Sequence, residues 1–211
     1  NNPTQNFVDR FEVIKFDADG KAIGTEPFDW NNPEHVANIY KNRDPRFYYT
    51  VLYNNRFWIK RTIGVWRDGT NYGPDIDPKN HNFSRTGYYL RKFWPRSCFD
   101  EKNPGSANLS SYHMRLGEIY LNYAEAMNEA YGPYTDGLGL SEKYTAADAI
   151  NELRARLKCP ASSTIGGESD PYYYVKEERE ENPDFPVLED GMPPLPTNLS
   201  QDQARERIRN E

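Results

Sequence analysis

The chain has 211 residues, enough for one sizeable domain or for part of a larger protein, and its net charge is −6. Hydrophobic residues make up 36% and aromatic residues 14%, so rings supply much of the apolar surface that a core needs, which argues against disorder. The sequence contains no basic stripe of the kind that nucleic-acid binding needs, and nothing that resembles a membrane span, a signal peptide or a lipid-bearing cysteine.

The first part of the chain predicts short elements separated by turns. Residues 7–13 favour a helical turn. Residues 17–21 favour a Gly-containing turn over a calcium loop, whose remaining ligands are missing. Asn32 and Pro33 form the start signal of a helix, which should end near Arg43 because Pro45 disfavours helix at Asp44.

Residues 47–60 are rich in β-forming residues and predict two short strands joined by a turn at Asn54 and Asn55. Residues 61–110 are interrupted repeatedly by glycine and proline, so we expect loops there, with one short extended stretch at residues 86–94. So many rings in a loop-rich region indicate a shaped surface.

A long helix is predicted next, capped by Ser110 or Ser111 and ended by Gly132. Its apolar residues recur in steps of three and four, as on one face of a helix. They are Tyr112, Leu116, Ile119, Tyr120, Tyr123, Met127 and Tyr131. We expect this stripe, its tyrosines included, to face the core.

Two further helices are predicted from their capping patterns, Thr145 with Asp148 and Ser200 with Gln203. The apolar stripe of the first consists of Ala149, Ile150, Leu153 and Leu157. Its two arginines, Arg154 and Arg156, are expected on a solvated or inter-helix ionic face. The segment between the two helices, residues 160–199, is predicted to be a long surface insertion.

No catalytic signature is present. The histidines His35, His81 and His113 lie far apart without metal-ligand spacing, and no cofactor is expected. A Gly-rich phosphate loop and a nucleophile elbow are both missing from the sequence. Asp75 and Asp77 are the first candidates for a hydrolytic carboxylate pair, although acids beside prolines are typical of turns.

The candidates for ligand binding lie in the loops. A sugar site needs a ring to stack on the C–H face of a pyranose, and amide, carboxylate or arginine groups for the hydroxyls. One loop supplies both kinds of group: Trp66, Arg67, Asp68, Asn71 and Tyr72. Trp94 is a second aromatic candidate. The alternative for these rings is packing beneath the loop, and for Trp58, in a predicted strand, packing in the core is favoured.

Several segments, taken in order, resemble the C-terminal half of SusD/RagB proteins. They are residues 2–12 (NPTQ-x-x-VD-x-FE), 44–54 (DPRF followed by TVLYN), 86–93 (TGYY-x-RKF), 115–126 (RL-x-EIYLNYAEA), 149–156 (AIN-x-LR-x-R) and the start of an Arg/Glu-rich helix at 208–211. Within them, Leu116, Gly117 and Tyr120 also match a fragment of the tetratricopeptide repeat.

The resemblance implies a mainly α fold of tetratricopeptide-like helical hairpins, with long loop-rich excursions and a few short strands. Residues 1–211 would form a single domain or a fragment from the C-terminal part of such a protein. Its expected parts are a loop-rich aromatic region (1–110), a helical hairpin (111–159), an insertion loop (160–199) and the start of a truncated helix (200–211).

The resemblance also implies a function. The chain would belong to a non-catalytic, surface-exposed lipoprotein of the outer membrane of Bacteroidetes-type bacteria, attached to the membrane only through an N-terminal lipid anchor that is not in this chain. It would bind polysaccharides or oligosaccharides and deliver them to a SusC-like TonB-dependent transporter, with no nucleic-acid partner. Two alternatives stay open: a helical-repeat interaction scaffold of the transporter complex without its own sugar site, and a hydrolase. The scaffold would bury the loop rings and expose apolar residues on its helices.

Overall fold

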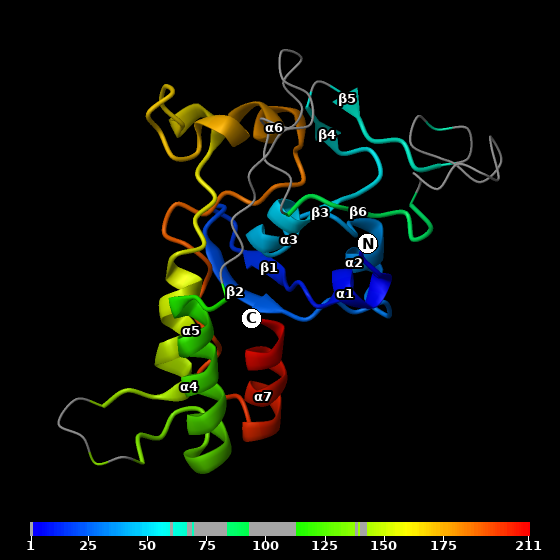
Figure 1. The fold of residues 1–211 in the computed structure, drawn as a ribbon. Coiled ribbons are helices and arrows are strands. Elements are labelled where there is room, and N and C mark those ends of the chain that lie inside the picture. Colours follow the sequence, from blue (N-terminus) through cyan, green and yellow to red (C-terminus); the bar gives the residue numbers. More distant parts are fainter. Residues whose placement is uncertain are drawn as a thin grey trace. The chain divides into compact units, whose positions relative to one another are not determined.

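The computed structural model describes residues 2–59, 61–66, 69, 84–92, 113–137, 139 and 143–211. The chain forms two compact units, each assembled from three separate stretches. Unit 1 comprises Asn1–Glu12, Pro27–Leu109 and Pro160–Val187, and unit 2 comprises Val13–Glu26, Ser110–Cys159 and Leu188–Glu211. Helices outweigh strands in the described residues, in agreement with the predicted mainly α class (Figure 1).

Unit 1 consists of short elements. Its helices are α1 (Gln5–Asp9), α2 (Pro33–Ala37), α3 (Pro45–Thr50) and α6 (Lys176–Glu181), with single 3-10 turns at Ser162–Thr164 and Tyr173–Val175. Its strands are β3 (Val51–Leu52), β4 (Phe57–Trp58), β5 (Arg61–Thr62) and β6 (Tyr89–Leu90). β3 pairs antiparallel with β6, and β4 pairs antiparallel with β5.

Capping residues decide where two of these helices begin. Asn32 caps α2 by accepting a hydrogen bond from the Glu34 amide at 3.0 Å, as predicted, but α2 already ends at Ala37. The strand predicted at residues 47–50 is wrong, because α3 occupies them. Asp44 caps α3 and Pro45 is its first residue, a start signal that outweighs the β propensity of the tyrosines that follow. The predicted strand pairing across the turn at residues 54 and 55 is wrong as well, since β3 and β4 have other partners.

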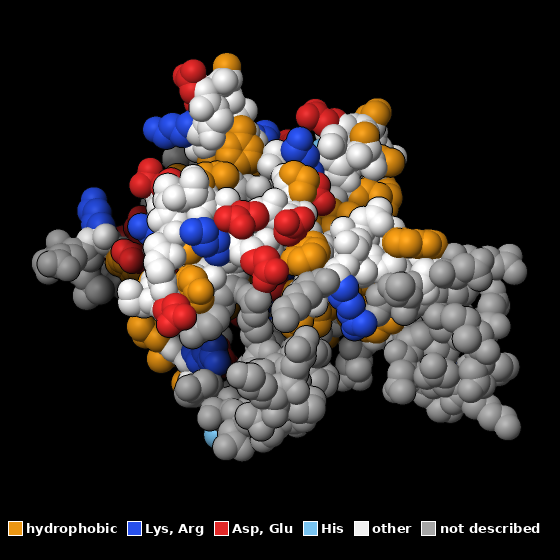
Figure 2. All heavy atoms as spheres, turned by 90° about the horizontal axis from the view of Figure 1, so that it is seen from above, with side chains coloured by type: hydrophobic (Ala, Val, Ile, Leu, Met, Phe, Trp, Pro, Cys, Tyr) orange, Lys and Arg blue, Asp and Glu red, His pale blue; other side chains and the backbone are white. Residues whose placement is uncertain are grey.

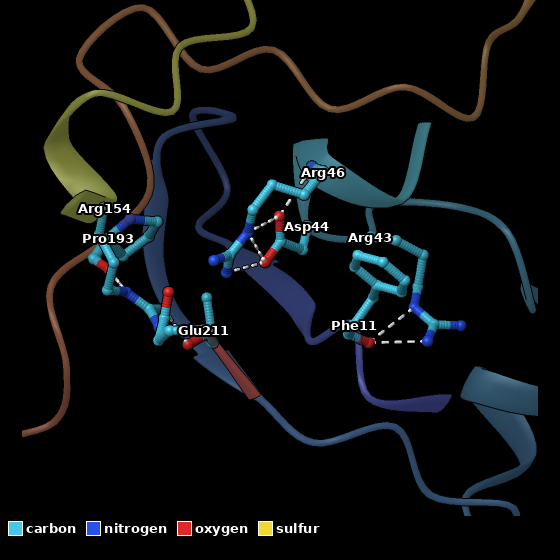
Figure 3. A network of polar contacts seen from close by, with 8 residues as sticks. Phe11, Arg43, Asp44, Arg46, Arg154, Pro193 and Glu211 are labelled. Carbon is cyan, nitrogen blue, oxygen red and sulfur yellow. Dashed lines mark hydrogen bonds and ion pairs between the residues drawn. The ribbon is translucent and has the colours of Figure 1, made fainter. Parts of the chain in front are cut away.

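The core of unit 1 is aromatic and encloses a buried arginine. Phe47, Tyr48 and Tyr53 pack together with Val8 and Phe185. The side chain of Arg43, 0% exposed, donates hydrogen bonds to the backbone oxygens of three residues, of which Figure 3 shows Phe11. These acceptors are Val8, Phe11 and Ile39. Arg43 therefore ties α1, the residues after it and the approach to α3 into one core.

Residues 160–199 are more than the surface insertion that the sequence predicts. Glu178 of α6 is buried and accepts hydrogen bonds from Arg56 at 2.9 Å and from Arg91 at 3.1 Å. Asn182 fixes β4 by accepting from the Phe57 amide at 2.8 Å. The same segment adds core residues to both units: Phe185 to unit 1, and Leu188, Met192 and Leu195 to unit 2.

Unit 2 combines helices α4 (Leu116–Tyr131), α5 (Ala146–Ala155) and α7 (Gln201–Asn210) with an antiparallel pair of strands, β1 (Val13–Phe16) and β2 (Ala22–Glu26). The turn between the strands forms as predicted: Asp17 accepts hydrogen bonds from the amides of Asp19 and Lys21, and Gly20 has φ +77°. α4 packs against both α5 and α7 (Figure 1). The main core cluster of the unit contains Ala124, Met127, Ala146, Ala149, Ile150, Leu195 and Ile208.

The helix starts of unit 2 follow the predictions in two of three cases. The capping boxes Thr145–Asp148 and Ser200–Gln203 are both formed. The cap predicted for α4 at Ser110 or Ser111 is wrong, because α4 begins at Leu116 after Arg115, which makes no side-chain capping bond.

The predicted core stripe of α4 is only partly buried. Met127 is buried, and Tyr120 and Tyr123 are half-buried against the core cluster. Leu116 and Ile119, however, are 60% and 52% exposed. Tyr131 is also exposed. Apolar residues spaced by three and four positions form a helix face that is wider than the strip covered by α5 and α7. The sequence alone does not show which edge of that face remains exposed to solvent.

Candidate functional site

Trp66 follows the β4–β5 hairpin of unit 1, where local hydrogen bonds fix the backbone. The Asn55 amide donates to the Ile63 oxygen, and the Ile63 amide donates to the Arg56 oxygen, both at 2.8 Å. The Val65 amide then donates to the Asn54 side chain at 3.0 Å. The residues that lead up to Trp66 are thus held against the hairpin.

A small hydrophobic cluster supports this hairpin from below. It contains Leu52, Trp58 and Ile63, with Val65 packed at its margin. Trp58 is 9% exposed, which confirms its prediction as a core residue. The hairpin is therefore a fixed base for the residue that emerges from it.

Trp66 itself is 50% exposed, and two glycines allow its position. A Cβ atom at Gly64 would lie 2.8 Å from Cη2 of the indole, a contact too close to exist. A Cβ atom at Gly69 would lie 2.6 Å from the Gly64 oxygen, and the Gly69 amide donates to the Trp66 oxygen at 2.8 Å. At Gly69 a side chain would collide with backbone, so this position needs a glycine. At Gly64 the collision would be with the end of the indole, so the ring can lie against Gly64 only because that residue has no side chain, while half of the Trp66 surface stays exposed.

The other predicted contact residues lie outside the described residues. They are Arg67, Asp68, Asn71, Tyr72 and Trp94. The predicted site therefore stays a prediction for these five residues, and Trp66 is the member whose geometry is defined.

Most described rings of unit 1 serve the core. Tyr48, 0% exposed, donates from its hydroxyl to the Tyr40 oxygen and the Asp184 oxygen, and burial raises its pKa well above the ordinary value. Burial likewise raises the pKa of Tyr53, whose ring stacks on Tyr40 with centroids 4.2 Å apart. Core packing therefore accounts for much of the high aromatic content that suggested a binding surface. An exposed ring in unit 1 is an exception that core packing does not explain.

The sequence profile of the SusD family matches residues 2–211. The chain belongs to the SusD family. The resemblance found in the sequence is thereby confirmed over nearly its whole length.

A solved structure supports the fold of this SusD-family chain. It is that of a SusD-like carbohydrate-binding protein from Bacteroides fragilis, with a TM-score of 0.56 and 22% sequence identity. The similarity covers 99% of this chain and 31% of the other protein, so the chain spans less than a third of that relative's length. Among curated proteins, none has a sequence that matches the chain.

The structure reveals a second exposed tryptophan that the sequence reasoning missed. Trp30 is 47% exposed, and its indole Nε1 donates to the Asp9 carboxylate at 2.9 Å. The signal available in the sequence was its setting between Asp29 and Asn31, because a tryptophan between polar residues in a loop is poorly placed for a core. Figure 2 shows one face of the SusD-family chain, on which apolar side chains reach the surface between acidic and basic groups.

Candidate metal-binding clusters and helices that could span a membrane are both absent from the described residues. Within the described residues, His, Cys, Asp and Glu side chains do not gather in any group of three or more that could hold a metal ion. Of the helices in the same residues, none is both long enough and apolar enough to cross a membrane.

Proposed function

We propose that this SusD-family chain is part of a non-catalytic, glycan-binding lipoprotein on the cell surface. The observation that carries the proposal is the half-exposed ring of Trp66, held in place by Gly64 and Gly69. The solved SusD-like relative is a carbohydrate-binding protein, which supports the same class of ligand here. In this proposal the α4–α5 pair is a tetratricopeptide-like repeat.

The chemistry of the proposed site follows from its residue types. The indole of Trp66 and the ring of Tyr72 stack on the apolar C–H faces of sugar rings, and Trp94 adds a third ring. Arg67, Asp68 and Asn71 donate to or accept from the hydroxyl groups at the edges of the sugar. Because the indole already lies against Gly64 at the end of a hydrogen-bonded hairpin, little conformational freedom is lost when a glycan binds.

We also propose that the protein delivers its bound glycan to a transporter. A SusC-like TonB-dependent transporter in the outer membrane receives the bound polysaccharide or oligosaccharide, and a lipid at the N-terminus of the complete protein anchors it beside that transporter. A surface site that binds without reacting is suited to this role, since the ligand must leave it intact.

The double variant Trp66→Ala with Tyr72→Ala tests the site. We expect it to weaken binding by about tenfold for each lost ring, because burying a large apolar side chain contributes about 1.5–3 kcal/mol and 1.4 kcal/mol corresponds to a factor of ten. The measurement is affinity electrophoresis of the full-length protein through gels that contain amylopectin, xylan, galactomannan or pectic galactan, followed by calorimetry.

Tyr131→Ala is the matched control, because it removes a ring that is 43% exposed in unit 2. Its binding should equal that of the unsubstituted protein. If the unsubstituted protein is retarded in no gel, the glycan proposal is contradicted for those polymers. If it binds and the double variant binds equally well, the function stands but the site lies elsewhere.

One observation favours the scaffold alternative as a second candidate. At the start of α4, Met114, Leu116 and Ile119 are 63%, 60% and 52% exposed. Large apolar side chains that gather on one helix end are typical of a surface that another protein covers. In this second candidate the transporter, or a further helix, packs on the start of α4.

The variant Leu116→Gln with Ile119→Gln tests the second candidate. We expect it to lower co-purification with the TonB-dependent transporter from outer-membrane extracts severalfold, while stability changes by less than about 0.5 kcal/mol because both side chains are exposed. Glu118→Gln, an exposed change between the two positions, is the control. Undiminished co-purification in the double variant would contradict the scaffold candidate.

A further inference from the structure

We infer that Trp30 is a second stacking platform for a sugar ring in unit 1, separate from the Trp66 loop in sequence and held by its own contacts. The inference rests on the proposed glycan-binding function and adds a site to it. Its basis is the way in which the surrounding residues fix an exposed indole that the core does not use.

The edge of the indole is fixed by a chain of hydrogen bonds. Nε1 of Trp30 donates to one oxygen of Asp9 at 2.9 Å, and the other oxygen of Asp9 accepts from the Gln5 amide at 2.8 Å. The oxygen of the Gln5 side chain in turn accepts from the Tyr88 hydroxyl at 2.8 Å. Tyr88 belongs to the aromatic core, so the chain leads from the buried core to the exposed ring.

The ring is also supported by a neighbouring aromatic ring. Phe28 meets Trp30 edge to face, with centroids 5.1 Å apart and an interplanar angle of 73°. Phe28 stacks on His35, with centroids 5.5 Å apart, and the Arg43 guanidinium lies 4.4 Å from the Phe28 centroid. Phe28, His35 and Arg43 are all buried, so Trp30 is the exposed outer member of a group of packed side chains.

The loop that carries Trp30 is closed at both sides of the residue. The Asp29 amide donates to Nδ1 of His35 at 3.1 Å, and the Asn32 amide donates to the Asp29 oxygen at 3.1 Å. Asn32 is at the same time the cap of α2. The backbone around the indole is thus set by a helix start and a turn, and neither needs a ligand to form.

This arrangement fits a sugar better than an apolar partner. With Nε1 bonded to Asp9, the indole offers a ligand chiefly its apolar face, as stacking on a pyranose requires. The residues on either side, Asp29 and Asn31, are exposed, and the Asn31 carboxamide donates to one oxygen of the Asp29 carboxylate at 3.0 Å. A carboxylate and a carboxamide are groups that bind sugar hydroxyls, and this bond sets the two side chains beside the ring. A fixed ring loses little freedom on binding, which is how a single platform contributes measurable affinity.

The test uses Trp30→Ala in the full-length protein, together with Val187→Ala as a matched control in the same unit. Val187 is 49% exposed against 47% for Trp30, so both changes remove exposed apolar surface, but only one removes a ring. We expect Trp30→Ala to weaken binding about tenfold to whichever gel polysaccharide retards the unsubstituted protein. Val187→Ala should leave it unchanged. Trp30→Phe, which keeps a ring but loses the bond to Asp9, should lie between them.

A second readout locates the contact. In protein labelled with 5-fluorotryptophan, the fluorine resonance of Trp30 is assigned from the Trp30→Phe variant. It should shift when an oligosaccharide fragment of the polymer that retards the protein is added. The resonance of the buried Trp58 serves as the internal reference.

The three possible outcomes distinguish the Trp30 platform from the proposed function. A tenfold loss together with a shifted Trp30 resonance supports the platform. Binding that is equal in Trp30→Ala and the unsubstituted protein, with an unshifted resonance, overturns it and leaves the proposed function intact. Failure of the unsubstituted protein to bind any of the polymers overturns the proposed function, and the platform with it.

Discussion

Replacing Arg154 by methionine is expected to lower the free energy of unfolding of unit 2 by about 3–5 kcal/mol, the cost of breaking a buried ion pair by removing one partner. Arg154 is 0% exposed, and each of its three guanidinium nitrogens donates a hydrogen bond. It donates to the Pro193 oxygen and to the Thr25 hydroxyl, both at 2.7 Å, and it pairs with the Glu211 carboxylate (Figure 3).

The large effect follows from what the substitution leaves behind. The Glu211 side chain is 2% exposed, so its charge would stay in the interior after its partner had gone. The Pro193 oxygen would lose its donor as well. Methionine keeps the apolar stem of the arginine, so the loss of packing is small and the electrostatic loss dominates.

Arg156→Met is the matched control, because Arg156 lies on the same helix end and is exposed. It should change stability by less than about 0.5 kcal/mol. The measurement is urea unfolding followed by far-ultraviolet circular dichroism, which reports mainly on the long helices α4, α5 and α7. A loss of less than about 1 kcal/mol in Arg154→Met would show that the Glu211 carboxylate is solvated and that the buried pair does not form.

Arg43→Met is expected to destabilise unit 1 by a similar amount, about 3–5 kcal/mol. The guanidinium donates to the oxygens of Phe11 and Ile39, and each buried acceptor left without a donor costs about 1–3 kcal/mol. It also donates to the Val8 oxygen, which keeps the Phe11 amide as a second donor. It also lies over the Phe28 ring at 4.4 Å. Burial lowers the pKa of Arg43 to about 10, so the group is still charged at neutral pH and the variant removes a charged donor.

Lys41→Met is the control for Arg43→Met, since Lys41 is exposed two residues away. The two units can be observed separately, because all four tryptophans of the chain, Trp30, Trp58, Trp66 and Trp94, belong to unit 1. Tryptophan fluorescence in urea should therefore show the shift for Arg43→Met. An unchanged fluorescence midpoint would contradict the central role of Arg43 in this core.

Local signals in the sequence predicted local structure well. The capping boxes at Thr145 and Ser200 and the cap at Asn32 are formed as expected, because a cap depends on residues at most three positions away. The helix at residues 45–50 had the same kind of signal in Asp44 and Pro45. There the start signal prevails over the β propensity of the residues that follow.

Burial was harder to predict, because it depends on distant segments. Arg154 lies on an ordinary amphipathic helix, and its partners Thr25, Pro193 and Glu211 come from three other parts of the chain. Leu116 stays exposed although its spacing fits a core stripe. Trp30 owes its fixed position to Asp9, which no local pattern connects with it. The prediction of the candidate site was limited in the same way. Composition pointed to the Trp66 loop, but the steric role of the glycines and the contacts that fix Trp30 depend on the three-dimensional structure.

The division of the chain into interleaved stretches has a consequence for its biogenesis. The chain passes from one unit to the other at residues 12–13, 26–27, 109–110, 159–160 and 187–188. During synthesis neither unit can close its core until its third stretch, which begins at residue 160 or 188, has left the ribosome, so contacts of high sequence separation set the folding rate. Recombination therefore cannot exchange one unit as a single contiguous cassette.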